Sequence, residues 1–142
     1  DLTDASFRRS ILVRTNFSAS ELKGTKFIDA KLTDVNLTVC DLRKTIFENC
    51  LFDGSDFKTS DLTGLCLDGQ TFIGVRFGEA ALKGVTFRGA TLKNVSFTPP
   101  WSLTKKYYRA IKTICFDEAM MDKLTYAALK GMEADLSKVT VI

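Results

Sequence analysis

Residues 41–65 read DLRKT IFENC LFDGS DFKTS DLTGL, five blocks of five residues in which the second position is always Leu or Phe. The same spacing holds at every fifth position from Leu2 to Phe97, twenty positions without a gap. A period of five fits neither the 3.6-residue turn of a helix nor the two-residue alternation of a strand. The internal repeat therefore decides the fold.

A second regularity runs two residues ahead of each Leu or Phe, where the chain carries mostly small or β-branched residues. Leu65 and Gln70 are the exceptions. The other three positions of each unit hold nearly all of the charged residues, Asn and Gly, as expected for positions that face water and form turns. The pattern predicts two inward and three outward positions per unit.

This pattern closely resembles the pentapeptide repeat family, in which a small residue, often Asp or Asn, then Leu or Phe, and two polar residues follow one another. The units at residues 55–59 (SDFKT) and 60–64 (SDLTG) match it well, and the resemblance covers about two-thirds of the chain. It implies a right-handed quadrilateral β-helix, in which each unit is one side and four units complete a coil.

The inward Leu and Phe residues fall into columns when those twenty residues apart are grouped together, which supports a coil of four sides. One column is entirely leucine, a second is Phe except at Leu37, and a third is Phe except at Leu67. The three columns are Leu2, Leu22, Leu42, Leu62 and Leu82; Phe17, Leu37, Phe57, Phe77 and Phe97; and Phe7, Phe27, Phe47, Leu67 and Phe87. We expect an all-β solenoid of five to six coils, with the repeat domain spanning residues 1–98.

The repeat stops at Pro99-Pro100, because proline cannot donate a ladder hydrogen bond. Residues 99–142 are predicted to form a cap of two short α-helices, one over 102–114 with Ser102 as N-cap and one over 123–130 with Gly131 as a left-handed C-terminal cap. Four units around these helices have the small-then-apolar spacing and are expected to form an interrupted sixth coil. They are centred on Phe116, Met121, Leu136 and Val141.

The apolar spacing of both helices favours packing across the open end of the rod, which repeat proteins need to cover. The side chains expected to turn toward the rod are Leu103, Tyr107, Ile111, Leu124 and Leu129. The alternative is a docking element, because Trp101, Tyr107, Tyr108 and the basic first helix are of the types that dominate interface hot spots.

Missing residue types limit the chemistry. The chain contains no His, the commonest general base and metal ligand. A carboxylate pair around Asp41 and Asp61 is the remaining catalytic alternative, but such positions are ordinary in the family. We expect no enzyme activity, no cofactor, no metal and no small-molecule substrate.

The four cysteines are Cys40, Cys50, Cys66 and Cys115, and none of them forms a metal-binding CxxC pair. Cys40 and Cys50 occupy small inward positions, where a thiol acts as a small hydrophobe. Free thiols favour a reducing compartment, so a cytoplasmic location is expected. No apolar stretch is long enough to span a membrane, and no membrane partner is expected.

Charge bears on two alternative functions. Family members that protect bacterial gyrase from fluoroquinolones look like B-form DNA, so the resemblance implies a topoisomerase-binding DNA mimic as one alternative. Residues 1–100 contain 13 Lys and Arg against 12 Asp and Glu, whereas a mimic needs an anionic surface. Weak nucleic-acid binding is the other alternative, through basic clusters at residues 8–14 and 105–112, but the net charge of +3 does not favour it.

The favoured interpretation is a rigid scaffold or protein-interaction module with an unidentified protein partner, existing as a monomer or an end-to-end dimer. Apolar residues at outward positions of one side and aromatic or basic residues near the first helix are the candidate partner surface. They are Ile11, Val13, Leu51, Ile73, Trp101, Tyr107, Tyr108 and Arg109.

Overall fold

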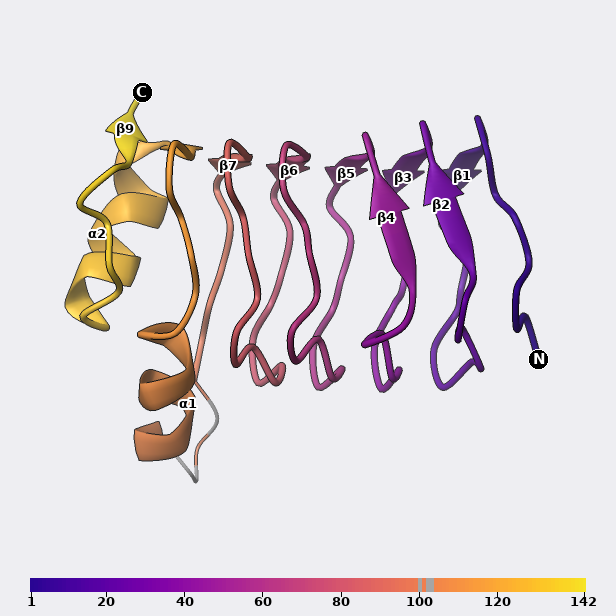
Figure 1. The fold of residues 1–142 in the computed structure, drawn as a ribbon, viewed down its shortest axis with the longest axis horizontal. Coiled ribbons are helices and arrows are strands. Elements are labelled where there is room, and N and C mark those ends of the chain that lie inside the picture. Colours follow the sequence, from indigo (N-terminus) through magenta and orange to yellow (C-terminus); the bar gives the residue numbers. More distant parts are fainter. Residues whose placement is uncertain (100, 102–103) are drawn as a thin grey trace.

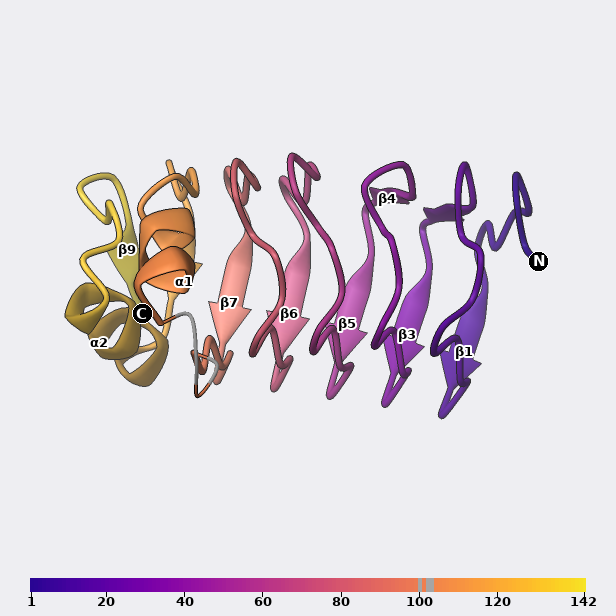
Figure 2. The same cartoon turned by 90° about the horizontal axis from the view of Figure 1, so that it is seen from below.

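The computed structural model describes residues 1–99, 101 and 104–142 of the chain. The described residues form a rod, in which one coil follows another from the N-terminus to a pair of helices at the C-terminal end (Figure 1). Figure 2 shows the same rod turned by 90°, with the short strands of one side stacked side by side along its length.

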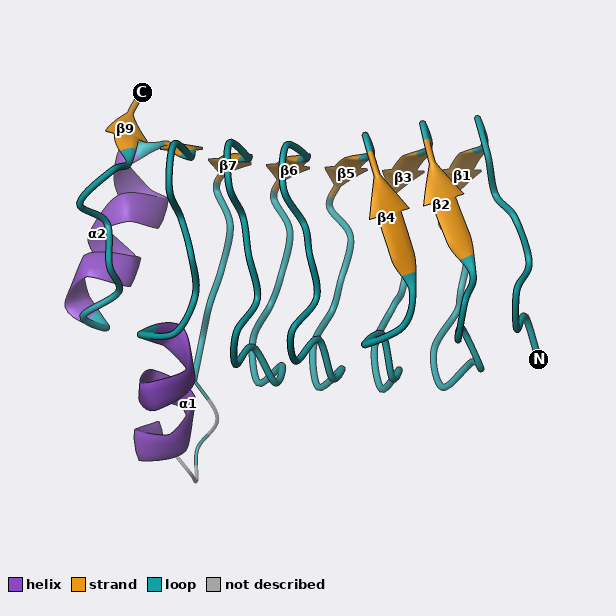
Figure 3. Ribbon diagram, viewed as in Figure 1, coloured by secondary structure: helices purple, strands orange, loops and turns teal. Residues whose placement is uncertain are grey.

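The strands are three residues long or shorter and all pair in parallel, within two sheets (Figure 3). The larger sheet contains β1 (Ile11–Val13), β3 (Lys31–Thr33), β5 (Leu51–Asp53), β6 (Thr71–Ile73), β7 (Thr91–Lys93), β8 (Met120–Met121) and β9 (Thr140–Val141). The smaller sheet contains β2 (Lys26–Ile28) and β4 (Ile46–Glu48). The helices are α1 (Thr104–Ile111) and α2 (Lys123–Gly131).

The register confirms the predicted twenty-residue coil. Leu12 pairs with Leu32, Leu32 with Phe52, and Phe52 with Phe72, each twenty residues further along. The other two sides are joined by single bridges at the same spacing, such as Asn36 with Asp56 and Asp41 with Asp61. Connections between parallel strands of one sheet are right-handed in nearly all proteins. The fold is accordingly a right-handed quadrilateral β-helix.

The core consists of the inward Leu and Phe ladders. Phe27 stacks on Phe47 with ring centroids 5.1 Å apart, and Phe52 stacks on Phe72 at 5.0 Å. Phe57 stacks on Phe77 at 4.9 Å. These rings are buried, and burying one Phe contributes roughly 1.5–3 kcal/mol, so the ladders are the main source of stability.

The small inward residues tie successive coils together. The Thr45 hydroxyl donates to the carbonyl oxygen of Leu22 at 2.9 Å, and the Ser55 hydroxyl donates to that of Leu32 at 2.9 Å. Gln70, one of the two exceptions in the sequence, makes the same bond through Nε2 to the Phe47 carbonyl at 2.9 Å, while its buried Oε1 has no partner among the described residues.

The last residue of most units is left-handed, which lets the chain turn each corner. Gly24 has φ 71°, and a Cβ there would overlap the Asp4 carboxylate of the preceding coil. Gly54 stands in the same relation to Asp34. Glycine adopts this conformation without strain and leaves room for the aspartate, whereas other units place residues such as Asp34 and Thr59 at the same left-handed point.

The four C-terminal units were expected to form one sixth coil. That expectation is wrong, because they are divided between two partial coils. Met121 pairs with Leu92 on one side and with Val141 on the other. Phe116 stacks on Phe87 at 5.4 Å. Phe116 and Met121 therefore belong to a sixth partial coil, and Leu136 and Val141 to a seventh, because α1 and α2 each replace other sides.

The helices pack on the C-terminal end of the rod. Tyr107, Ile111 and Leu129 are buried there, as predicted. The expectation for Leu124 is wrong, since this residue is 74% exposed and Thr125 beside it is buried instead. Leu103 and the expected N-cap Ser102 lie outside the described residues.

Side chains of the cap accept hydrogen bonds from backbone groups that the repeat leaves open. The N–H of Gly64 donates to the carbonyl of Lys83 one coil on at 2.8 Å, whereas the N–H of Gly84 donates to the Thr113 hydroxyl at 2.8 Å. The N–H of Val95 donates to the Thr125 hydroxyl at 3.1 Å. The cap therefore stabilises the last full coil, above all at Val95, where the bond is buried and an unpaired N–H would cost about 1–3 kcal/mol.

The ends of α2 match the sequence only in part. Asp122 is its N-cap and accepts from the N–H of Thr125 at 3.2 Å. The prediction of Gly131 as a left-handed cap is wrong, because Gly131 is the last helical residue and Glu133 carries the positive φ of 61°. The N–H of Met132 bonds back to Leu129, which tightens the last turn before the chain reverses.

Candidate interaction surface

The outer face of the seven-stranded sheet, here called the strand face, carries the four apolar residues that the sequence assigned to it. Ile11 and Val13 flank the inward Leu12 on β1 and are 76% and 50% exposed. Ile73 ends β6 at 37% exposure, and Leu51 begins β5 partly buried. The flat sheet holds these side chains in fixed positions.

The strand face contains two apolar groups rather than one patch. Lys31 stands between Ile11 and Leu51 in the same register column, so β3 separates β1 from β5 and β6. Met120, in the same column further along, is 41% exposed and was missed from the sequence. Its position directly before the inward Met121 could have identified it, because the residue before an inward one points outward.

Tyr107 does not belong to an exposed surface, and its inclusion in the candidate surface is wrong. It is only 6% exposed, and its hydroxyl donates to the carbonyl oxygen of Phe77 at 3.2 Å. Burial raises the pKa of the Tyr107 hydroxyl, which keeps the donor protonated. The helical period explains the placement, because Tyr107 and the fully buried Ile111 are four residues apart on the face toward the rod.

The outer face of α1, here called the helix face, runs through Lys105, Tyr108, Arg109 and Lys112. Tyr108 and Arg109 follow Lys105 by three and four residues, and Lys112, the residue after the end of α1, follows them by four and three, so the four share one side. Tyr108 is 36% exposed, Lys105 and Arg109 are exposed, and Trp101 ahead of the helix is fully exposed. The structure thus brings three of the candidate residues, Trp101, Tyr108 and Arg109, to the surface at this end.

A cleft of about 430 Å³ runs between α1 and the rod. Ala80, Ala81 and Ala110 line it together with charged residues of both signs, among them Glu79 and Lys106. Its mixed charges and apolar lining suit a polypeptide surface better than a small anion.

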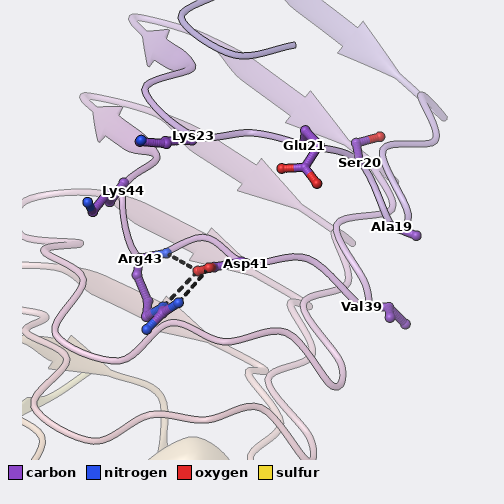
Figure 4. Close-up of a pocket in the computed structure, with 8 residues that line it drawn as sticks. All are labelled: Ala19, Ser20, Glu21, Lys23, Val39, Asp41, Arg43 and Lys44. Carbon is purple, nitrogen blue, oxygen red and sulfur yellow. Dashed lines mark hydrogen bonds and ion pairs between the residues drawn. The ribbon is translucent and has the colours of Figure 1, made fainter. Parts of the chain in front are cut away.

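The leucine side of the rod has an open cleft of about 610 Å³, shown in Figure 4. Arg43 binds Asp41 through two hydrogen bonds, of 2.7 and 2.9 Å, and lies 3.4 Å from a carboxylate oxygen of Asp61. The Arg43 guanidinium lowers the pKa of Asp41 to about 2. Arg43 therefore keeps Asp41 ionised, which argues against Asp41 as the carboxyl that holds a proton in a catalytic pair.

Two of the four thiols, those of Cys40 and Cys50, are buried in the rod. Cys50 is buried and donates to the Phe27 carbonyl at 3.1 Å, and burial raises the pKa of its thiol, as it does for Cys40. Among the described residues, no group of three or more His, Cys, Asp or Glu could hold a metal ion. Within the same part of the chain, neither helix has the length and apolar character to cross a membrane.

Charges on the rod are mixed along its length. Arg76 pairs with Asp56 at 3.2 Å, and Arg88 with Asp117 at 3.6 Å, in each case across neighbouring coils. The N-terminal cluster of Arg8, Arg9 and Arg14 lies exposed on the first coil. With 13 basic and 12 acidic residues among the first 100, the rod has neither the anionic surface of a DNA mimic nor a continuous basic track.

Several solved structures share this architecture. HetL, a pentapeptide repeat protein involved in heterocyst differentiation regulation in the cyanobacterium Nostoc sp. strain PCC 7120, is 19% identical, with a TM-score of 0.52, over 84% of this chain and 58% of HetL. A trypsin-treated variant of QnrB1, a plasmid-mediated fluoroquinolone resistance protein, is 16% identical with a TM-score of 0.45, over 99% of this chain and 85% of QnrB1. At these identities the HetL match supports the fold alone.

A further similar structure is a pentapeptide repeat protein from the Arabidopsis thaliana thylakoid lumen, 19% identical with a TM-score of 0.33, over 84% of this chain and 59% of that protein. No curated protein sequence matches the chain. The family model described as "Pentapeptide repeat region" matches residues 1–77, which is more than half of the chain. With the five-residue period, the four-sided coil and this match together, the chain belongs to the pentapeptide repeat family.

Proposed function

We propose that this chain is a non-enzymatic protein-interaction module that binds a partner protein through the strand face. Pentapeptide repeat proteins are generally structural or interaction modules, which supports the class of function. The observation that carries the proposal is the exposure of Ile11, Val13 and Ile73 on one rigid sheet. Apolar side chains held in place by a sheet lose little conformational entropy on binding, which favours association.

The partner that fits this surface is a protein with a flat, partly apolar face. Lys31 and Asp53 lie between the apolar residues in the same register columns, so opposite charges on the partner would set its orientation. Contacts of the apolar side chains with the partner would supply affinity, and Lys31 and Asp53 would supply specificity.

Affinity capture with matched variants tests the proposal. Wild-type chain, Ile73→Asp and Ile11→Asp are immobilised beside Val39→Asp, a control in which an exposed residue at a corner outside this sheet changes in the same way. We expect a partner that is retained by the wild type and the control and lost from both strand-face variants, with circular dichroism unchanged. Capture of the same proteins by all four chains would contradict the proposal.

Light scattering on the wild-type chain separates a partner protein from self-association, since a monomer or an end-to-end dimer is expected. If the strand face is itself the contact between copies, Ile73→Asp will convert a dimer into a monomer. That result would replace the partner protein by a second copy of the chain.

The DNA-mimic alternative has no support in the charge of the rod. A gyrase supercoiling assay with and without fluoroquinolone is expected to show neither inhibition nor protection. Protection at about micromolar protein, in the concentration range of specific complexes, would favour the alternative over the interaction module.

A further inference from the structure

The helix face carries basic residues that lie close together in the sequence. On the rod, Arg43, Arg76 and Arg88 each lie within 4.0 Å of an aspartate, whereas most other basic residues there, such as Lys26 and Lys58, have no such pair among the described residues. On α1, Lys105 and Arg109 are exposed and have no ion pair of that length among the described residues, while Lys112, the residue after the end of α1, pairs with Glu133 at 2.7 Å. This short helix therefore presents positive charge that the fold itself does not neutralise.

Aromatic exposure marks the same end of the molecule independently of charge. Trp101 is the only tryptophan in the chain, and it is fully exposed three residues before α1 begins. Tyr108, between the basic residues, is 36% exposed. Trp, Tyr and Arg are the residue types most enriched at the energetic centres of protein interfaces, where they are covered by the partner.

The spacing of the charges indicates the kind of partner. Lys105 and Arg109 are four residues apart on α1, so they lie about 6 Å apart along the helix at 1.5 Å per residue. Carboxylates on consecutive turns of a second helix repeat at the same distance. An acidic helix lying along α1 would thus meet Lys105 and Arg109 at once, whereas Lys112 is already paired with Glu133.

Two other classes of polyanion fit less well. A bilayer would have to receive an apolar helix side, but Tyr107 and Ile111 on that side are buried against the rod. A nucleic acid needs a longer basic track, but Glu79 lines the cleft beside Lys106 and Glu133 lies against Lys112. The positive surface is therefore local and suits a short protein segment.

We propose that the helix face, together with Trp101, binds an acidic helical segment of a partner protein, with carboxylates opposite Lys105 and Arg109 and an apolar side chain against the indole of Trp101. The site lies at the capped end of the rod and uses none of the strand-face residues. It is a second binding site of a defined chemical class, and it stands or fails separately from the strand face.

The single Trp101 makes a direct binding assay possible, because all tryptophan fluorescence comes from the proposed site. The probe is a synthetic helical peptide without aromatic residues, with Glu at positions i, i+4 and i+7 and one adjacent Leu. A matched peptide replaces each Glu by Gln. We expect the Glu peptide to shift the emission to shorter wavelength with a saturable curve, and the Gln peptide to bind about tenfold more weakly or worse.

Charge-reversal variants test the location of the site. The double variant Lys105→Glu/Arg109→Glu is expected to weaken binding of the Glu peptide by about tenfold or more. The matched control Lys26→Glu/Lys58→Glu reverses two exposed lysines elsewhere on the rod, with the same net charge change, and is expected to stay within about twofold. Trp101→Phe, followed by calorimetry, is expected to bind more weakly than wild type.

Three results would overturn the proposal. The first is a flat emission titration with the Glu peptide, and the second is equal weakening by both double variants, which would mean general attraction to net charge. The third is that duplex DNA or vesicles with anionic lipid shift the emission at lower concentration than the Glu peptide. Ile73→Asp leaves this titration unchanged if the two sites are separate, so failure here and failure of the strand face are distinguishable.

Discussion

Replacement of Phe57 by Ala is expected to remove about 3–5 kcal/mol from the free energy of unfolding, the usual loss for a buried phenylalanine. Phe57 is fully buried in the middle of the rod. Its ring stacks on Phe77 with centroids 4.9 Å apart and meets Phe52 at 5.4 Å and Phe47 at 6.2 Å. Each aromatic pair contributes about 0.5–1.5 kcal/mol beyond burial, and coils above and below prevent the cavity from collapsing.

Urea unfolding followed by far-ultraviolet circular dichroism measures this loss, whereas fluorescence does not, because Trp101 is exposed and outside the core. An unchanged m value shows that the rod still unfolds as one unit. Phe7→Ala is the matched control, since Phe7 stacks on Phe27 at 5.1 Å but lies partly exposed on the first coil. We expect about half the loss there.

Phe57→Leu separates volume from aromatic stacking, because Leu37 already occupies the same ladder one coil earlier. A loss of about 1.5 kcal/mol is expected. If Phe57→Ala loses less than about 1 kcal/mol with m unchanged, or no more than Phe7→Ala, the ladders are not the main source of stability and the reasoning is wrong.

Tyr107→Phe keeps the ring but removes the donor to the Phe77 carbonyl, so it should lower the free energy of unfolding by about 0.5–1.5 kcal/mol. Leu124→Ala is the control, because Leu124 is exposed, and it should change that free energy by no more than about 0.5 kcal/mol. Equal losses in urea unfolding would contradict the packing of α1. The second prediction concerns acid. Because Arg43 lowers the folded-state pKa of Asp41 from 3.8 to about 2, the pair adds stability above about pH 4 that is lost as the pH falls through about 2. Both side chains are more than half exposed, at 54% and 59%, so the contribution should stay below about 1 kcal/mol. Asp41→Asn is expected to lose that amount at pH 7 and clearly less at pH 2, where Asp41 is about half protonated; an equal loss at the two pH values would show that the effect is not the ion pair.

The rod was predictable residue by residue, and the cap was predictable only in outline. Phe57 and Leu32 face inward because every fifth residue has the same environment in a four-sided coil, so the period alone assigns them. The outward direction of Ile11 and Val13 follows from the same rule. Their exposed fractions do not, because these depend on what stands in the neighbouring coils.

In the cap, the sequence did not determine which side of each helix faces the rod. The apolar spacing in α2 favoured Leu124 for the buried side, but Thr125 is buried because its hydroxyl accepts the N–H of Val95. In α1 the period placed Tyr107 toward the rod, while its residue type favoured an interface. A hydrogen bond to the Phe77 carbonyl decides between the two.

The sequence by itself determined the contacts that repeat at a spacing of twenty. Each coil takes twenty residues, so two residues that are twenty apart lie next to each other in neighbouring coils. The tertiary structure decided the contacts that do not repeat. Thr113 meets Gly84 across 29 residues, and Thr125 meets Val95 across 30, because the inserted helices change the length of the coil. Such spacings are set by how a helix packs on the end of the rod, and no period in the chain records them.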